Sequence, residues 1–312
     1  MPHRSARVAA AMQAAGRASY HGVLSRQEAL AVGLTDDDVQ GLLRRGRWQR
    51  LYRGVCAIDE PSDLSQAYAA ILAVRPISGV ASHATAARAH GLPLLRLDRD
   101  AAERECVTVG RHCRGPFVAG LQVYSHNLGA ADQIRIGAVH VTGIARTVMD
   151  LLLREDRATA IWAAERALAT GRVSAAEITD RLEAARHVPG TVAARKAFAL
   201  ADCRSESPLE TLARLVIIDG GLPLPEAQIP IVDPSSGELW FRVDLGYKHR
   251  RIAIECDGRE VHGRPDAVFA DRRRQNQLHL LGWTVLRITW YDVVHRPAYV
   301  LWLIKSALAE AS

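Results

Sequence analysis

FRVDLGYKHRRIAIECDGREVH, residues 241–262, is the stretch of sequence that decides the fold. In its second half, the apolar residues Ile252 and Ile254 alternate with other residues, which predicts a β-strand with one buried face. The opposite face of this strand would carry Glu255 and Asp257 side by side. Two carboxylates on one face of a half-buried strand are costly unless positive charge accompanies them, so this strand marks a candidate functional site.

A third acid precedes that strand. Residues 239–246 are expected to form a strand of their own, joined to the next one by a tight turn. If the turn has two residues, 248–249, Asp244 pairs with Ala253 and lies diagonal to Glu255 on the same face. Like charges this close raise one another's pKa, and each pKa unit corresponds to about 1.4 kcal/mol. We therefore expect either neighbouring arginines or a divalent cation in this patch.

The residue types around the patch indicate which cation it would take. Oxygen ligands without cysteine or clustered histidine favour a hard ion, Mg²⁺ or Mn²⁺, which commonly shares its shell with water and phosphate oxygens. Phosphodiester hydrolysis uses such an arrangement, because the ion generates hydroxide and stabilises the charge gathering on the phosphorane. The histidines at positions 83, 90, 112, 126 and 140 form no HxxxH or CxxH pair, so we expect ordinary packed or exposed side chains there.

Helices are expected before and after these strands. The first begins with a serine cap and a proline, and Glu210 lies three residues after the cap. The second covers residues 266–281, and its periodicity directs Arg274 toward the sheet. Arg272 and Arg273 point elsewhere on this helix and are candidates for contact with a DNA backbone.

The order of these elements resembles the PD-(D/E)xK nuclease fold, and most closely the very-short-patch-repair-like endonuclease domains. The resemblance covers residues 203–312 and rests on Asp244, the motif IECDG, His262 and the motif DRRRQNQLHLLGWTVLR. It implies that Asp244 and Glu255 are the metal-binding pair and that Glu210 completes the metal shell. It also implies that His262 is a proton carrier or a phosphate contact.

The chain departs from that superfamily at Asp257, which holds the place where many of these nucleases have the lysine that positions the attacking water. Asp257 is therefore a candidate for an additional metal ligand, with Arg274 supplying positive charge from the helix. Equally, the missing lysine is consistent with slow or absent cleavage. The structural alternatives are a capping box for Glu210, a turn for Asp257, a loop position for His262 and, for Asp244 and Glu255, ion pairs with Arg242, Arg251 or Arg287.

Residues 23–58 have the pattern of helix, tight turn, helix and hairpin, which is the plan of a winged helix-turn-helix. Ser25 and Thr35 are the expected N-caps of the two helices. Acids at 36–38 argue against contact of the second helix with DNA, since that end of a recognition helix approaches the phosphates. The basic residues at the helix end and on the wing argue for contact: Arg44, Arg45, Arg47, Arg50 and Arg53. DNA contact, protein docking and a purely structural use all stay open, and any DNA binding should fall steeply with salt.

Residues 61–202 mix helices with strand-like pieces and then become wholly helical. Together with the winged helix they resemble the antitoxin component of the AbiE type of abortive-infection toxin-antitoxin system. The wing GRWQRLYRGVCAI, the helix SHATAARAHGL and the closing helix TGIARTVMDLL carry this resemblance. It implies a winged helix that binds promoter DNA and represses its own operon.

The overall composition and charge limit the classes of protein to which the chain can belong. The 312 residues are 48% hydrophobic and 24% charged, with a net charge of +6 and a pI near 9.3, which is typical of a globular protein and hints at nucleic acid. The charge is uneven, at +3 in residues 1–60, +4 in 61–200 and −1 in 201–312. Five scattered cysteines without a CxxC pair argue against a disulfide framework or a zinc site. No apolar run suggests a membrane span or a signal peptide, so we expect a cytoplasmic protein.

These features predict an α+β protein with three domains: a winged helix-turn-helix at 1–60, a mixed then helical antitoxin-like region at 61–202, and a restriction-endonuclease-like domain with a central mixed sheet at 203–312. The leading hypothesis is a metal-dependent DNA endonuclease that holds Mg²⁺ or Mn²⁺ and is docked or regulated by its winged helix. The alternative is a non-catalytic, antitoxin-like DNA-binding repressor with a degenerate nuclease fold. A third hypothesis is that both ends bind a toxin or phage-defence partner protein.

Overall fold

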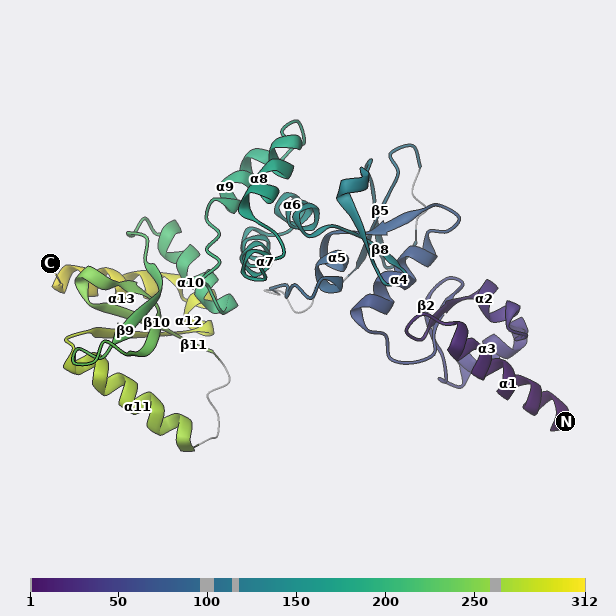
Figure 1. Ribbon diagram of the computed structural model, residues 1–312, viewed down its shortest axis with the longest axis horizontal. Helices are drawn as coiled ribbons and strands as arrows, with labels where there is room; N and C mark the ends of the chain where they lie inside the picture. The colour runs from purple at the N-terminus through teal and green to yellow at the C-terminus, as the bar shows by residue number, and fades with distance from the viewer. Residues whose placement is uncertain (1, 96–103, 114–117, 259–264, 312) are drawn as a thin grey trace. The chain divides into compact units, whose positions relative to one another are not determined.

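The computed structural model describes residues 2–95, 104–113, 118–258 and 265–311. The chain divides into two compact units, residues 1–198 and 199–312 (Figure 1). Across the described ranges it forms thirteen α-helices and three sheets, which confirms the α+β class. None of the helices described is long and apolar enough to cross a membrane. All five cysteines are free thiols, as expected.

The first unit begins with a winged helix-turn-helix arrangement. Its elements are α1 (Pro2–Ala18), β1 (Val23–Ser25), α2 (Arg26–Ala31), α3 (Asp36–Arg44), β2 (Gln49–Tyr52) and β3 (Val55–Ala57), with sheet order β1-β3-β2. Ser25 and Thr35 are the N-caps of α2 and α3 and form reciprocal capping boxes, so each helix begins where the sequence predicts. Leu24, Leu42 and Trp48 are buried in the core between the helices and the sheet.

A five-stranded mixed sheet and a group of helices complete the first unit. The sheet has the order β6-β5-β4-β8-β7, from β4 (Gly79–Ala81), β5 (Glu105–Val109), β6 (Leu121–Ser125), β7 (Gln133–Ile136) and β8 (Val139–Thr142). The helices are α4 (Asp63–Ala73), α5 (His83–Ala89), the 3-10 helix η1 (Ala130–Asp132), α6 (Ile144–Arg154), α7 (Arg157–Ala169), α8 (Ala175–Ala184) and α9 (Thr191–Phe198). Helices α4 and α5 pack on the sheet, and α6 packs against α5, α7, α8 and α9. A further division of this unit at residue 60 stays a prediction.

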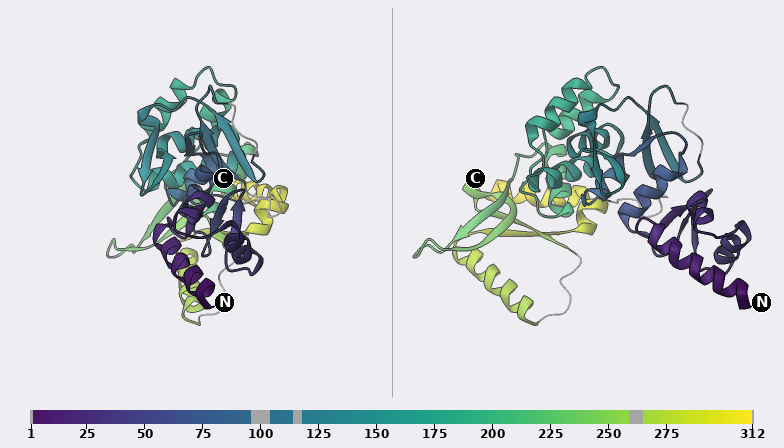
Figure 2. Two further views of the ribbon diagram at one scale, coloured as in Figure 1. Left: turned by 90° about the vertical axis from the view of Figure 1, so that its right-hand side faces the viewer. Right: turned by 45° about the vertical axis from the view of Figure 1, so that its right-hand side comes forward.

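The second unit is a four-stranded mixed sheet between two layers of helices. Its elements are α10 (Pro208–Asp219), β9 (Glu226–Val232), β10 (Leu239–Tyr247), β11 (Ile252–Asp257), α11 (Pro265–Leu280), β12 (Thr284–Thr289), α12 (Trp290–His295) and α13 (Pro297–Glu310). The strand order is β12-β11-β10-β9, and only β11 and β12 run parallel among these neighbours. Helix α11 covers one face of the sheet, and α10, α12 and α13 pack together on the other (Figures 1 and 2). Leu278 of α11 is buried against Ile229, Ile231 and Val243.

The turn between β10 and β11 differs from the predicted one. It is the 3-10 helix η2 (Lys248–Arg250), followed by Arg251 at a φ of 51°. Gly246 therefore pairs with Ala253, and the predicted pairing of Asp244 with Ala253 is wrong. The register moves by two residues because the turn is longer, and a two-residue shift leaves each side chain on its original face. Consequently Asp244 still lies close to Glu255.

Candidate active site

Four acids lie around the carboxyl end of β11. Glu255 is buried on β11, Asp244 is half-buried on β10, and Glu210 is buried in the first turn of α10. Asp257 is the last residue of β11 and is partly exposed. The thiol of Cys256 indicates their proximity, because its pKa is raised well above its ordinary value by burial and then by the charges of all four carboxylates. The fold therefore gathers at one place the acids of three separate elements.

Asp244 bonds to the backbone where the ladder between β10 and β11 ends. Its Oδ2 accepts a hydrogen bond from the backbone N–H of Cys256 at 2.8 Å, just beyond the last paired residues, Leu245 and Ile254. Burial raises the pKa of the Asp244 carboxyl, although the hydrogen bond from Cys256 and the charge of Arg274 lower it. Additional positive charge beside Asp244 would therefore stabilise its ionised form.

Arg274 of α11 is the counter-ion of Glu255. Its Nη2 donates to both carboxylate oxygens of Glu255, at 2.8 and 2.7 Å, and to the backbone oxygen of Arg242 at 2.6 Å. The guanidinium also lies over the ring of Phe241, 4.8 Å from its centroid. Burial nevertheless raises the pKa of Glu255, while the charge and the hydrogen bonds of Arg274 lower it. One of the two expected ways of neutralising the patch, a neighbouring arginine, is thus present.

Glu210 bonds to groups outside its own helix. Its Oε2 accepts hydrogen bonds from the backbone N–H of Glu206 at 2.9 Å and from Nε2 of Gln228 at 3.1 Å. Burial raises the pKa of Glu210, and the charge of Asp244 contributes to the rise. Gln228 has a φ of 53°, an unusual conformation for a residue with a side chain, and strain of this kind is typical of functional sites. The sequence analysis missed Gln228, whose signal is a polar side chain between the apolar residues Ala227 and Ile229 of β9.

Asp257 lies at the open side of the cluster. Its nearest ion pair is with Nη1 of Arg287 at 3.9 Å, and the two side chains are 39% and 38% exposed. An exposed pair at this distance contributes little to stability, typically less than about 1 kcal/mol. Arg287 is the register neighbour of Glu255 on β12, so its position follows from the parallel pairing of β11 and β12.

The basic residues proposed to meet DNA are exposed where the structure describes them. Arg272 and Arg273 project from α11, next to the inward-facing Arg274. His262 lies outside the described residues. On the winged helix, every one of the proposed arginines is exposed: Arg44, Arg45, Arg47, Arg50 and Arg53.

The acids at the start of α3 are partly neutralised within the winged helix. Asp36 forms an ion pair with Arg26, and Asp38 forms one with Arg7. Hydrogen bonds from Arg7 and Thr35 hold the pKa of Asp38 well below its usual range. The repulsion of phosphate that three free aspartates would cause is therefore reduced.

The donor atoms of the acid cluster suit a hard divalent ion, although their arrangement does not yet form a complete cage. Asp244 and Glu255 offer carboxylate oxygens, and burial raises the pKa of both, although the charge of Arg274 lowers it. Arg274 contacts both oxygens of Glu255. Within the described ranges, no three histidine, cysteine, aspartate or glutamate side chains are placed to hold one metal ion together.

Comparison with known proteins identifies the second unit. A restriction-endonuclease-like family model, REase_MTES_1575, matches residues 228–308. The match runs from β9 to α13 and includes Asp244, Glu255 and Asp257, whereas Glu210 precedes it. The C-terminal part of the chain is therefore an endonuclease-like domain, as the sequence analysis predicts.

Two curated relatives cover most of the chain. Both come from Mycobacterium tuberculosis and are named Uncharacterized protein MT2308 (strain CDC 1551 / Oshkosh) and Uncharacterized protein Rv2248 (strain ATCC 25618 / H37Rv). Each is 35% identical over 265 residues, which is 83% of this chain and 91% of the relative. The combination of both units is therefore a shared property of these proteins.

Proposed function

The chain belongs to the same family as these two mycobacterial proteins, and we propose that it is a metal-dependent endonuclease that hydrolyses DNA phosphodiester bonds. The observation that carries the proposal is the cluster of Asp244, Glu255 and Glu210 around the end of β11. Burial raises the pKa of all three carboxyls, and for Asp244 and Glu255 it does so against the charge of Arg274. Buried carboxylates that lie close together destabilise the folded state, and a bound cation would offset that destabilisation.

Asp244 and Glu255 would hold Mg²⁺ or Mn²⁺, with Glu210 and Asp257 as further oxygen donors. When bound, the ion would supply a hydroxide nucleophile at neutral pH and stabilise charge on the reacting phosphate. Arg274 orients Glu255 and adds fixed positive charge beside the phosphate. His262 is proposed as a proton carrier or a phosphate contact, and Arg272 and Arg273 are proposed to bind the DNA backbone.

The winged helix is proposed to dock the enzyme on DNA. Five exposed arginines at the end of α3 and on the β2–β3 wing support this role, as does the internal pairing of Asp36 and Asp38. Contacts of this kind read phosphates rather than base edges, so they would position the endonuclease-like unit with little sequence preference.

Plasmid cleavage tests the proposed activity. Supercoiled plasmid should be nicked or linearised with Mg²⁺ or Mn²⁺ and stay intact with EDTA, and Glu255→Gln should abolish the reaction without unfolding the protein. The matched control is Glu238→Gln, which changes an exposed glutamate of the same unit. Intact plasmid across a metal and substrate screen, together with no heat of Mn²⁺ binding in calorimetry, would contradict the proposal.

A second candidate function is a non-catalytic repressor of the antitoxin type, with a toxin or phage-defence protein as partner. Two observations favour it: Asp257 stands where related nucleases have a lysine, and Arg274 contacts both oxygens of Glu255. A repressor of this kind would retard the DNA upstream of its own gene in a mobility-shift assay, even in EDTA. The double variant Arg47→Ala with Arg50→Ala would no longer retard that DNA. A complex with a partner and no affinity for DNA would favour the protein-interaction hypothesis instead.

A further inference from the structure

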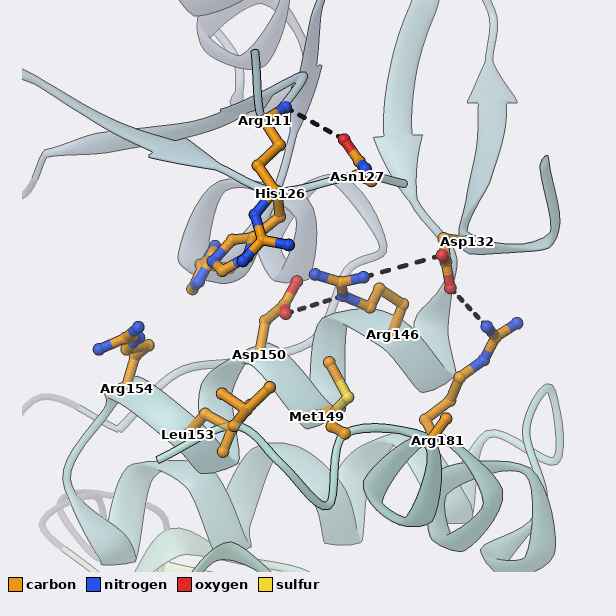
Figure 3. Close-up of a pocket in the computed structure, with 14 residues that line it drawn as sticks. Arg111, His126, Asn127, Asp132, Arg146, Met149, Asp150, Leu153, Arg154 and Arg181 are labelled. Atoms are coloured by element: carbon orange, nitrogen blue, oxygen red, sulfur yellow. Dashed lines mark hydrogen bonds and ion pairs between the residues drawn. The ribbon is translucent and has the colours of Figure 1, made fainter. Parts of the chain in front are cut away.

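A basic pocket lies in the first unit, far in sequence from the acid cluster. It has a volume of about 340 Å³ and is bounded by the ends of β5 and β6 on one side and by α6 and the end of α8 on the other (Figure 3). Arg111 follows β5, His126 follows β6, and Arg154 is the last residue of α6. A pocket of this size is in the range of small-molecule sites.

Two of the four arginines in the pocket already have acid partners. Arg146 bonds to Asp150 at 2.8 Å and lies 3.8 Å from Asp132, which also pairs with Arg181. Arg111 and Arg154 are exposed, and neither forms an ion pair with any acid in the part of the chain that the structure describes. The pocket therefore offers two positive charges to an anion from solvent.

Asp150 supplies a second independent sign of a ligand. The residue is 3% exposed, its Oδ1 accepts from Arg146, and its Oδ2 is buried without a hydrogen-bond partner. Figure 3 shows the carboxylate between Arg146 and the side of the pocket formed by Arg111 and His126. Buried carboxylate oxygens are nearly always hydrogen-bonded, so this oxygen indicates a missing donor.

The walls of the pocket combine strain with an apolar surface. His83 lines the pocket with a φ of 51°, is 2% exposed, and stacks on the ring of Tyr124 with centroids 3.8 Å apart. Residues held in this backbone region are concentrated at ligand sites. Met149, Leu153 and Val188 add apolar surface to the lining of the pocket. A ligand that fills the pocket would therefore need both a charged part and an apolar part.

We propose that this pocket binds a nucleotide. Arg111 and Arg154 would hold its phosphate, a hydroxyl or amino group would donate to Oδ2 of Asp150, and the base would lie against Met149 and Leu153. Arginine suits phosphate because its planar guanidinium donates two parallel hydrogen bonds. Inorganic phosphate would leave both Asp150 and the apolar wall without a partner, so the observations favour an organic phosphate of nucleotide size.

Calorimetry on the full chain in EDTA tests the proposal, because EDTA removes metal-dependent binding by the endonuclease-like unit. The probes are AMP, GMP, CMP and UMP, the corresponding nucleosides, inorganic phosphate and a 5′-phosphorylated oligonucleotide. At least one mononucleotide should bind saturably, and its nucleoside at least about tenfold more weakly. Arg111→Gln and Arg154→Gln should each weaken nucleotide binding about tenfold or more, since hydrogen bonds to charged groups are the strong ones.

Arg135→Gln is the matched control, because Arg135 is an exposed arginine of the same unit that does not line the pocket. It should leave the affinity unchanged. Asp150→Asn should weaken nucleotide binding while leaving any binding of inorganic phosphate unchanged, with folding checked by circular dichroism. Tighter binding of the oligonucleotide than of a mononucleotide, lost in Arg111→Gln and Arg154→Gln but kept in Arg47→Ala with Arg50→Ala, would assign the pocket to a nucleotide at a strand end rather than a free one.

Three outcomes would overturn the assignment. They are the absence of nucleotide binding by the wild-type chain, binding of inorganic phosphate alone, and affinity that survives both Arg111→Gln and Arg154→Gln. Because none of these measurements involves DNA cleavage, failure of this assignment is distinguishable from failure of the proposed endonuclease activity.

Discussion

Two buried carboxylates, each bonded to an arginine, lie in contrasting surroundings. In the second unit, Glu255 pairs with Arg274 inside a cluster where the other close charges are mainly acids. In the first unit, Asp150 pairs with Arg146 in a pocket lined by three further arginines. The same kind of ion pair thus lies among acids in one unit, where a cation site is proposed, and among arginines in the other, where an anion site is proposed. The groups around the pair decide which ligand is favoured, and the net charge of +6 for the chain does not.

The largest expected effect is on catalysis in the acid cluster. Asp244→Asn keeps the shape of the side chain but removes its charge, so it should lower metal-dependent plasmid cleavage at least about a hundredfold. Gel assays of nicking rate against Mg²⁺ concentration would measure this. Asp150→Asn is the control variant in the other unit and should leave the cleavage rate unchanged. If both variants lost cleavage equally, the two carboxylates would not have the different roles proposed for them.

The second-largest effect is expected from substituting the arginine partner of each buried carboxylate, and the response to Mg²⁺ should distinguish the two sites. Arg274→Ala and Arg146→Ala each leave a buried carboxylate without its counter-ion, and each should cost about 2 kcal/mol of unfolding free energy. Added Mg²⁺ should restore part of the loss in Arg274→Ala if the acid cluster binds a cation as proposed, and none of the loss in Arg146→Ala. Urea unfolding with and without Mg²⁺ would measure both values, and an identical response to Mg²⁺ would contradict the distinction.

The pH dependence of stability should show the burial of Asp150. Burial raises the pKa of this carboxyl to about 6 in the folded protein, above its ordinary value of 3.8. The folded state therefore binds the proton more tightly than the unfolded state does. The contribution of this group to the free energy of unfolding is fully present below pH 3.8 and is lost as the pH rises through about 6. Between pH 4 and pH 6.5, urea unfolding should show a loss on the order of 2 kcal/mol that is absent from Asp150→Asn. Matching pH profiles for the two proteins would exclude this role.

DNA affinity of the winged helix should depend on its exposed arginines. Arg47→Ala with Arg50→Ala should weaken binding about tenfold at low salt and flatten the slope of log affinity against log salt by about two. Fluorescence anisotropy with a labelled duplex would measure both quantities. Arg135→Ala, an exposed arginine elsewhere in the same unit, should leave them unchanged. An unchanged salt slope in the double variant would show that DNA contact lies elsewhere.

The smallest expected effect is on stability at Asp257. Its contact with Arg287 is long and both side chains are exposed, so Asp257→Asn should change the unfolding free energy by less than about 0.5 kcal/mol. A change in cleavage without a change in stability would assign Asp257 to the reaction. A destabilisation above about 1 kcal/mol, which is the upper limit for an exposed ion pair, would instead show a structural role.

Local patterns predicted the elements more reliably than the contacts between them. The caps at Ser25, Thr35 and Ser207 lie where the sequence predicts, because a capping bond joins residues only three positions apart. The β10–β11 register was wrong, because one additional residue pair in a turn changes register without changing the alternation of either strand. The alternation did place Asp244 near Glu255, since a shift of two residues preserves the faces.

The contacts missed from the sequence involve residues distant along the chain. Gln228 reaches Glu210 across 18 positions, and His83 belongs to the same pocket as Asp150. The motifs SHATAARAHGL and TGIARTVMDLL were recognised separately, and nothing in either one shows that they line a common pocket. His126 is expected from the sequence to be an ordinary packed or exposed histidine, and the structure places it in the lining of that pocket beside Arg111.

The sequence by itself determined the α+β class and the endonuclease-like domain, and it predicted the winged helix and the acids of the cluster, because periodicity, caps and short motifs are local properties of the chain. Only the tertiary structure decided that Arg274 neutralises Glu255, that Glu210 joins Asp244 around Cys256, and that the first unit encloses a basic pocket. The physical reason is that charge, burial and an unsatisfied oxygen such as Oδ2 of Asp150 depend on which distant residues the fold brings within a few ångströms.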